Sequence, residues 1–150
     1  MPIREVELMH GAVLVKLCRN DNPVTLRLIE TQDDLRSAYW INDSVVLYMK
    51  HSVAPQKRKR GERERWQFTF TENHIADLAE LVQGSTVYLV LICGQPGFEG
   101  TMEIALLEPG EWQTCLDLSG SGQQWLAVEA EPRRGLRVYG SCSGDNRVGV

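Results

Sequence analysis

Apolar and polar residues recur with a helical period in two stretches of the chain. Between residues 3 and 19, apolar side chains return at three- and four-residue steps, which predicts an amphipathic helix. Pro23 should end it, because proline disfavours helical backbone in the residue before it. Residues 71–84 form the second predicted helix, with Thr71 as the N-cap and Gly84 just past the end.

Strands are predicted from two-residue alternation and from one unbroken apolar run. Residues 24–30, 44–53 and 66–70 alternate, and the last two should pair as a hairpin. Residues 87–93 are apolar throughout, which is typical of a strand buried on both faces. Further elements are a turn or short helical piece at 31–36, strands at 39–41 and 102–107, a short helix at 112–118, and a closing hairpin of 125–128 with 136–139.

This order predicts an α/β (α+β) fold in which a central mixed β-sheet is flanked by helices. The chain has 150 residues, which fits one domain, and 43% of them are apolar, enough for a core. We expect a single mixed domain over residues 1–140. The last ten residues, 141–150, should fray.

The four cysteines and the first residues of the chain bear on location. None of Cys18, Cys93, Cys115 and Cys142 forms a CxxC pair, so we expect reduced thiols rather than a disulfide framework or a metal site. No basic stretch followed by an apolar run opens the chain, and the run at 87–93 is too short to cross a membrane. A cytoplasmic location is expected from these exclusions.

Positive charge is concentrated in one segment of an acidic chain. The formal net charge is −4, yet six of the 16 basic residues lie within residues 57–65: Lys57, Arg58, Lys59, Arg60, Arg63 and Arg65. A cationic segment on an acidic body can bind a polyanion locally, so these six residues are candidates for contact with nucleic-acid phosphates. The alternative is a solvated loop at the tip of the hairpin.

Three short segments carry a resemblance to a group of uncharacterised bacterial proteins. They are Leu47-Tyr48-Met49-Lys50-His51-Ser52, Trp66-Gln67-Phe68-Thr69-Phe70 and Leu91-Ile92-Cys93-Gly94. Together with the segment from His10 to Glu30, the resemblance covers roughly residues 10–118. It implies a shared fold and brings no activity with it.

The order of helix, three strands, helix and strand also resembles the PD-(D/E)XK, or restriction-endonuclease-like, core. That resemblance implies a divalent metal, Mg²⁺, held by carboxylates beside a lysine that assists the attacking water. Asp43 and Lys50 would match the aspartate and the lysine, and Glu30 would supply a second carboxylate. Tyr48 stands where the core has an acidic residue, and the strand at 66–70 is additional. The implied catalytic set is Glu30, Asp43 and Lys50, with Glu30 and Asp43 as metal ligands.

Each candidate also has a structural interpretation. Lys50 fits a solvated strand end, Asp43 a turn, and Glu30 an exposed strand terminus. His10, His51 and His74 have no partner near them in sequence to complete a catalytic dyad. Trp66, Phe68 and Phe70 are read as core residues rather than as platforms for bases.

Two hypotheses follow for function. The first is a nuclease-like, nucleic-acid-associated protein. The second is a non-catalytic protein-binding or regulatory module on the same fold, with a homo-oligomer or a protein partner compatible with it. The substitution at Tyr48 favours the second as far as catalysis is concerned.

Overall fold

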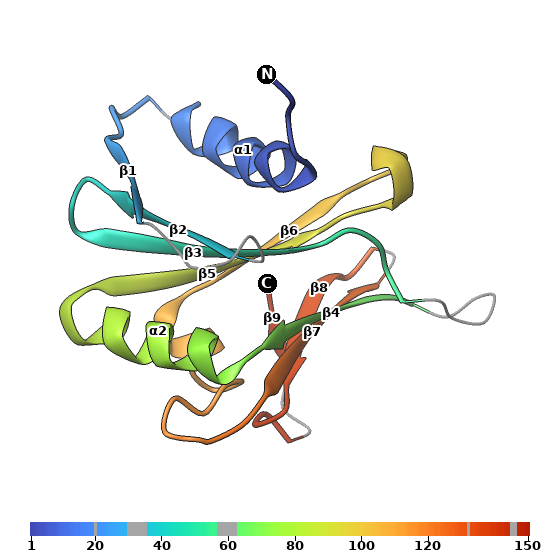
Figure 1. The fold of residues 1–150 in the computed structure, drawn as a ribbon. Coiled ribbons are helices and arrows are strands. Elements are labelled where there is room, and N and C mark those ends of the chain that lie inside the picture. Colours follow the sequence, from blue (N-terminus) through green and yellow to red (C-terminus); the bar gives the residue numbers. More distant parts are fainter. Residues whose placement is uncertain (20, 30–35, 57–62, 132, 145–146) are drawn as a thin grey trace.

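The computed structural model describes residues 1–19, 21–29, 36–56, 63–131, 133–144 and 147–150. The fold is mixed α+β, with two β-sheets and three α-helices in this part of the chain (Figure 1). The elements are α1 (Glu5–Cys18), β1 (Leu26–Ile29), β2 (Arg36–Ile41), β3 (Val45–Ser52), β4 (Glu64–Phe70), α2 (Glu72–Gly84), β5 (Thr86–Cys93), a 3₁₀ turn (Pro96–Phe98), β6 (Glu103–Leu107), α3 (Pro109–Trp112), β7 (Gln124–Glu131), β8 (Gly135–Gly140) and β9 (Val148–Gly149).

The first sheet is mixed and has the strand order β1-β2-β3-β5-β6. Strands β1, β2 and β3 form an antiparallel meander, and β5 then lies parallel to β3. The connection from β3 to β5 contains β4 and α2, as a parallel pair requires a crossover. The predicted mixed sheet with flanking helices is therefore confirmed.

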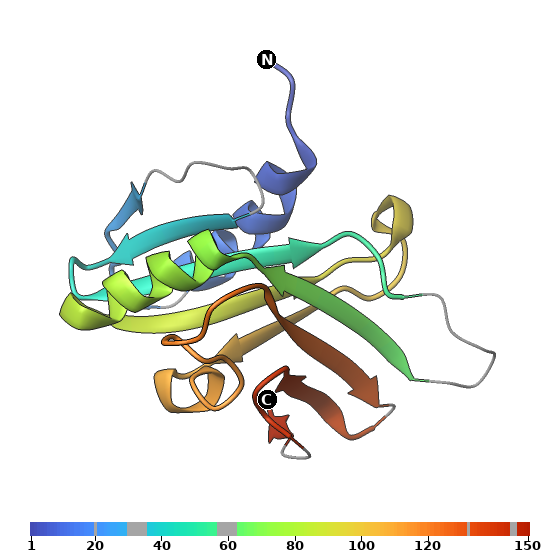
Figure 2. The same ribbon diagram turned by 60° about the horizontal axis from the view of Figure 1, so that its bottom comes forward.

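The second sheet is antiparallel and has the order β4-β7-β8-β9. It lies with α2 on the face of the first sheet opposite to α1 (Figures 1 and 2). One core fills the space between the two sheets and contains Trp66, Phe68 and Phe70 of β4. A smaller core lies between α1 and the first sheet and contains Met9 and Val13.

The predicted hairpin of residues 44–53 with 66–70 is wrong. Strand β3 belongs to the first sheet, whereas β4 pairs with β7 from Glu64↔Ala130 to Phe70↔Gln124. The apolar face of β4 is completed by Leu126 and Val128, which lie some sixty residues further along the chain and on the same core. The basic segment therefore connects two sheets and is not the tip of a hairpin.

Several boundaries also differ from the expectation. Residues 148–149 form β9 on the edge of the second sheet, so this part of the expected frayed tail is ordered by pairing with β8. The helix predicted at 112–118 lies earlier, at Pro109–Trp112, and Gly84 is the last residue of α2. The turn predicted at 31–36 lies outside the described residues, apart from Arg36, which begins β2.

All four cysteines are free thiols, as expected, with Cys93 and Cys115 buried. Burial raises the pKa of the Cys93 thiol well above its usual range, so this thiol stays protonated and behaves as a small apolar group. Within the described residues, no helix is long and apolar enough to cross a membrane.

Candidate functional site

The structure does not bring Asp43 and Lys50 together. Asp43 lies in the turn before β3, with φ of 57°, and its exposed carboxylate pairs with Arg27 (Nη2 to Oδ1, 3.3 Å). Lys50 lies near the far end of β3, and the strand between Val45 and Lys50 covers about 16 Å at roughly 3.3 Å per residue. The turn interpretation of Asp43 is therefore the one that the contacts support.

The predicted Mg²⁺ site also depends on Glu30, which lies outside the described residues. In the part of the chain that is described, no three His, Cys, Asp or Glu side chains gather as a metal site would require. Asp43 and Lys50 thus do not act as one unit, and the Mg²⁺ site stays a prediction.

Lys50 is buried, contrary to the solvated strand end that its sequence position favours. Only 4% of Lys50 is exposed, because its side chain points from β3 into the core between the sheets. Its ammonium donates to the carbonyl of Thr69, lies 2.9 Å from Nδ1 of His74, and stands 4.7 Å from the centre of the Phe70 ring. Lys50 therefore links β3 to β4 and to the start of α2.

His74 has two roles at the start of α2. Its own N–H donates to the Thr71 hydroxyl (3.3 Å), which confirms Thr71 as the N-cap. Its ring nitrogen Nδ1 accepts from the Thr71 N–H (3.3 Å) and faces the Lys50 ammonium, which places the ring proton on Nε2. His74 is 1% exposed, so the Lys50–His74 pair holds three elements together and is closed to substrates.

His10 of α1 and His51 of β3 form a second pair that the sequence did not reveal. Nε2 of His10 and Nδ1 of His51 lie 3.3 Å apart, and the rings meet edge to face. Burial, with a smaller contribution from the charge of His51, lowers the pKa of His10 to about 4. Burial also lowers the pKa of His51, partly offset by Glu5. Both rings are therefore neutral at pH 7, and they join α1 to the first sheet.

Of the six predicted phosphate-binding residues, the structure describes Arg63 and Arg65. Lys57, Arg58, Lys59 and Arg60 lie outside the described residues and precede β4 in the chain. Arg63 has a side chain that is 46% exposed, while Arg65 is 9% exposed. Arg65 lies in β4, on the second sheet, and Arg63 directly precedes that strand.

Arg65 occupies a row of directly opposed residues across the second sheet. It pairs with Glu129 of β7, and Glu129 pairs with Arg137 of β8. Directly opposed residues point to the same face of a sheet, and this face is the one opposite to Trp66 and the core. We name this surface the outer face, and it comprises Arg63, Arg65, Gln67, Trp125, Glu129, Arg137, Tyr139 and Arg147.

Aromatic rings and amides hold the Arg65 guanidinium in place. Nε of Arg65 donates to the Tyr139 hydroxyl (2.8 Å), and Nη1 donates to Gln67 (2.9 Å) and to Gln56. The guanidinium also lies 5.5 Å from the centre of the Trp125 ring and 5.6 Å from that of Tyr139. Arg65 is therefore a fixed part of the outer face, which its place in a charged segment did not suggest.

Glu129 is the acidic centre of the outer face and is only 5% exposed. It accepts from Nη1 of Arg147 (2.7 Å) and from the Tyr139 hydroxyl (2.9 Å), and Nη1 of Arg63 lies 3.9 Å away. Arg147 in turn stands 4.7 Å above the centre of the Tyr139 ring. A buried carboxylate thus lies against the Tyr139 hydroxyl and between two arginines that are far apart in the sequence, Arg63 and Arg147.

Among the eight residues that define the outer face, positive charge exceeds negative charge. Four arginines, Arg63, Arg65, Arg137 and Arg147, face a single carboxylate among its defining residues. The whole chain carries a formal charge of −4, so with +3 on this surface the remainder sums to −7. Guanidinium groups at this density suit anions with several oxygens, such as phosphate esters.

A signal for the outer face was present in the sequence. Arg65 directly precedes the alternating Trp66, Phe68 and Phe70, and on the same two-residue period as Gln67 it falls on the face of the strand opposite to those three rings. Arg137 and Tyr139 alternate with Leu136 and Val138 in the same way. What the sequence did not contain was the pairing of β4 with β7, which brings these alternating residues to one surface.

Comparisons with known proteins assign no family to this geometry. No protein-family model matches the chain, and neither a curated protein nor a solved structure matches it. Function must therefore be inferred from the described contacts themselves.

Proposed function

We propose that this protein binds nucleic acid through the outer face of its second sheet, with arginines contacting the phosphate backbone. The observation that carries the proposal is the opposed row of Arg65, Glu129 and Arg137, with Arg63 and Arg147 beside it. A guanidinium donates two parallel N–H bonds to the oxygens of a phosphate. Such contacts position a nucleic acid without reading its sequence.

Aromatic residues on the same surface support a nucleic acid over a simple inorganic anion. Trp125 and Tyr139 are half-buried, and their rings meet edge to face with centres 5.8 Å apart. A partly exposed ring next to a phosphate-binding arginine is the arrangement on which a base of a single strand can stack. We therefore expect single-stranded nucleic acid to bind more tightly than a duplex of the same length.

The uneven charge distribution also supports nucleic-acid binding, because it acts at long range, before contact is made. A surface at +3 on a body that is otherwise at −7 orients the protein as it approaches a polyanion. Lys57, Arg58, Lys59 and Arg60 lead into β4 and would add to the same positive field. Asp43, in the turn before β3, and Lys50, near the far end of that strand, have no catalytic role in this function.

A charge-matched pair of triple variants tests the proposal. The outer-face variant carries Arg63→Gln, Arg137→Gln and Arg147→Gln. The control carries Arg4→Gln, Arg19→Gln and Arg27→Gln, which remove the same charge from the N-cap of α1, its C-cap and β1. Binding of a labelled single-stranded oligonucleotide is measured by fluorescence anisotropy at 0.1 M salt. Loss of three phosphate contacts should weaken binding by about 100-fold in the outer-face variant.

The control variant should bind within about twofold of the wild-type protein, because its arginines lie outside the contact surface. Circular dichroism of both variants checks that the fold is retained. Equal weakening in the two variants would mean that only the net charge matters, which contradicts a defined surface. Absence of binding by the wild-type protein, to single strands and duplexes alike, would favour the protein-binding module instead.

A further inference from the structure

The face of the first sheet that α1 covers is only partly filled. Helix α1 packs over β3 and β5 through Met9 and Val13. Strand β6 is an edge strand, and on this face Leu106 is 48% exposed, with Met102, just before the strand, 38% exposed. A single helix of 14 residues is too narrow to cover a five-stranded sheet, so the β6 side stays open.

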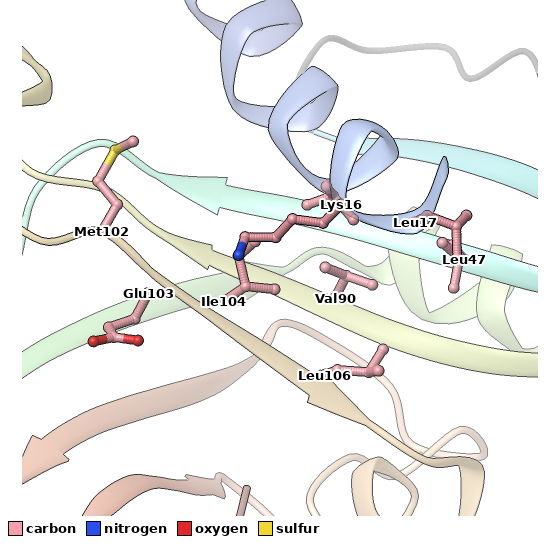
Figure 3. Close-up of a pocket in the computed structure, with 9 residues that line it drawn as sticks. Lys16, Leu17, Leu47, Val90, Met102, Glu103, Ile104 and Leu106 are labelled. Atoms are coloured by element: carbon pink, nitrogen blue, oxygen red, sulfur yellow. The ribbon is translucent and has the colours of Figure 1, made fainter. Parts of the chain in front are cut away.

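A groove of about 440 Å³ lies in this open space between α1 and β6 (Figure 3). Its lining is Val13, Lys16 and Leu17 of α1, Leu47 of β3, Val90 of β5, and Met102, Glu103, Ile104 and Leu106 at β6. Seven of these nine residues are apolar. Volume and lining are in the range of sites that take small molecules, of about 300–1,000 Å³.

The two charged residues of the lining differ in where they point. Figure 3 shows the Lys16 side chain extending from α1 along the groove, with its ammonium above Ile104. The Glu103 carboxylate, the other charged group of the lining, is directed away from that ammonium. The charged group over the apolar floor is therefore Lys16, with Glu103 turned away from it, and a ligand complementary to this part of the groove has an apolar body and one negative end.

We propose that this groove binds an amphiphilic carboxylate, an unbranched aliphatic chain with a single terminal carboxylate. The chain would lie on Leu47, Val90 and Ile104, and the carboxylate would pair with Lys16. This site is separate from the outer face, which lies on the other side of the first sheet (Figure 1). Binding of a carboxylate in this groove does not depend on nucleic-acid binding at the outer face.

Decanoate is the probe, and decanol, with the same chain and no charge, is its control. Affinities are measured by isothermal titration calorimetry below the concentration at which either compound forms micelles. We expect the wild-type protein to prefer decanoate about tenfold, and octanoate to bind about 15-fold more weakly than decanoate. The second factor corresponds to about fourfold for each buried methylene.

Two variants separate the charge from the apolar floor. Lys16→Gln should abolish the preference for decanoate over decanol while leaving decanol binding unchanged. Ile104→Trp should fill the groove and weaken both compounds more than tenfold, whereas Val15→Trp, at an exposed position on the same helix outside the lining, should leave both unchanged. Unfolding curves check that each variant is folded.

Three results would overturn the proposal. One is wild-type protein that binds neither decanoate nor decanol. Another is a preference for decanoate that survives Lys16→Gln. The third is equal weakening by Ile104→Trp and Val15→Trp, which would indicate adventitious contact with exposed apolar residues.

Discussion

The ammonium of Lys50 lies 2.9 Å from Nδ1 of His74 in the core between the two sheets. The two residues are 24 positions apart, and both are almost fully buried. A charged group at such a position needs acceptors, because desolvation of an unmatched ammonium costs several kcal/mol. The pair therefore fixes how β3, β4 and α2 meet, independently of any role in catalysis.

A double-mutant cycle measures this relationship. His74→Leu should lower the free energy of unfolding by about 3 kcal/mol, because it removes an acceptor from a buried ammonium. Lys50→Met keeps the volume and removes the charge, so His74→Leu should cost less in its presence. The coupling between the two sites should be about 1–3 kcal/mol by urea denaturation. Strictly additive effects would show that the contact has no energetic weight.

The His10–His51 pair predicts acid sensitivity of the helix α1 contact. The folded pKa of His10 is about 4, below the value of about 6.5 in an unfolded chain. The unfolded state therefore binds more protons in this window, and the contribution to stability is full above about pH 6.5 and is lost as the pH falls toward 4. Glu5 and Lys50 act on His51 in opposite directions.

His10→Phe removes this titration and keeps a buried ring. The wild-type protein should lose about 2–3 kcal/mol more than the variant when the pH is lowered from 7 to 4.5, since both proteins share every other titrating group. The free energy of unfolding is obtained from urea melts at several pH values. Parallel pH profiles for the two proteins would contradict the account of His10.

Gly94 follows β5 where three elements approach closely. A Cβ atom at this position would stand 2.7 Å from the carbonyl oxygen of Ser52 and 3.0 Å from that of Val53, and it would overlap the Met9 side chain. Gly94→Ala should lower the free energy of unfolding by about 2–3 kcal/mol, because backbone atoms cannot move aside cheaply. Thermal and urea melts give the value.

Gly11→Ala is the matched control for this substitution. Apart from the backbone of α1 itself and the two neighbouring residues, no atom lies within 4 Å of a Cβ at Gly11, in the interior of α1. Alanine there should raise the free energy of unfolding by about 1 kcal/mol through its higher helix propensity. A neutral Gly94→Ala would mean that the ends of β3 and β5 lie further apart than described.

Substitution of Glu129 should change the stability of the protein and its affinity for nucleic acid in opposite directions. Glu129→Gln keeps the shape but removes the charge that Arg63 and Arg147 face, so the free energy of unfolding should fall by about 2 kcal/mol. The same change raises the positive charge of the surface, so oligonucleotide affinity at 0.1 M salt should rise several-fold. A fall in both quantities, in protein that is still folded, would argue that Glu129 organises the arginines for binding.

Local sequence patterns were sufficient to predict individual helices and strands. The alternation of β3, the stripe and N-cap of α2 and the apolar run of β5 each predicted an observed element. The order α1, β1 to β3, α2 and β5 followed from them. The assignment to a nuclease-like core stays a prediction, since element order alone does not define a site.

The features that could not be predicted all depend on contacts between residues that are far apart in the sequence. The partner of β4 is β7. Several other strands have the same alternation of apolar residues as β7, so the sequence alone does not show which of them pairs with β4. Lys50 and His74 are 24 residues apart, and His10 and His51 are 41 apart. Each histidine therefore looked isolated although each has a neighbour in the fold. The outer face became visible only when register placed Arg65, Glu129 and Arg137 in one row.

The salt dependence of oligonucleotide binding tests the role of the outer face most directly. For a single strand, each phosphate contact contributes about −0.7 to the slope of log K against log salt concentration. The variant with Arg63→Gln, Arg137→Gln and Arg147→Gln should have a slope shallower than the wild-type slope by about 2, while the charge-matched control keeps the wild-type slope. Equal slopes for all three proteins would contradict binding through these arginines.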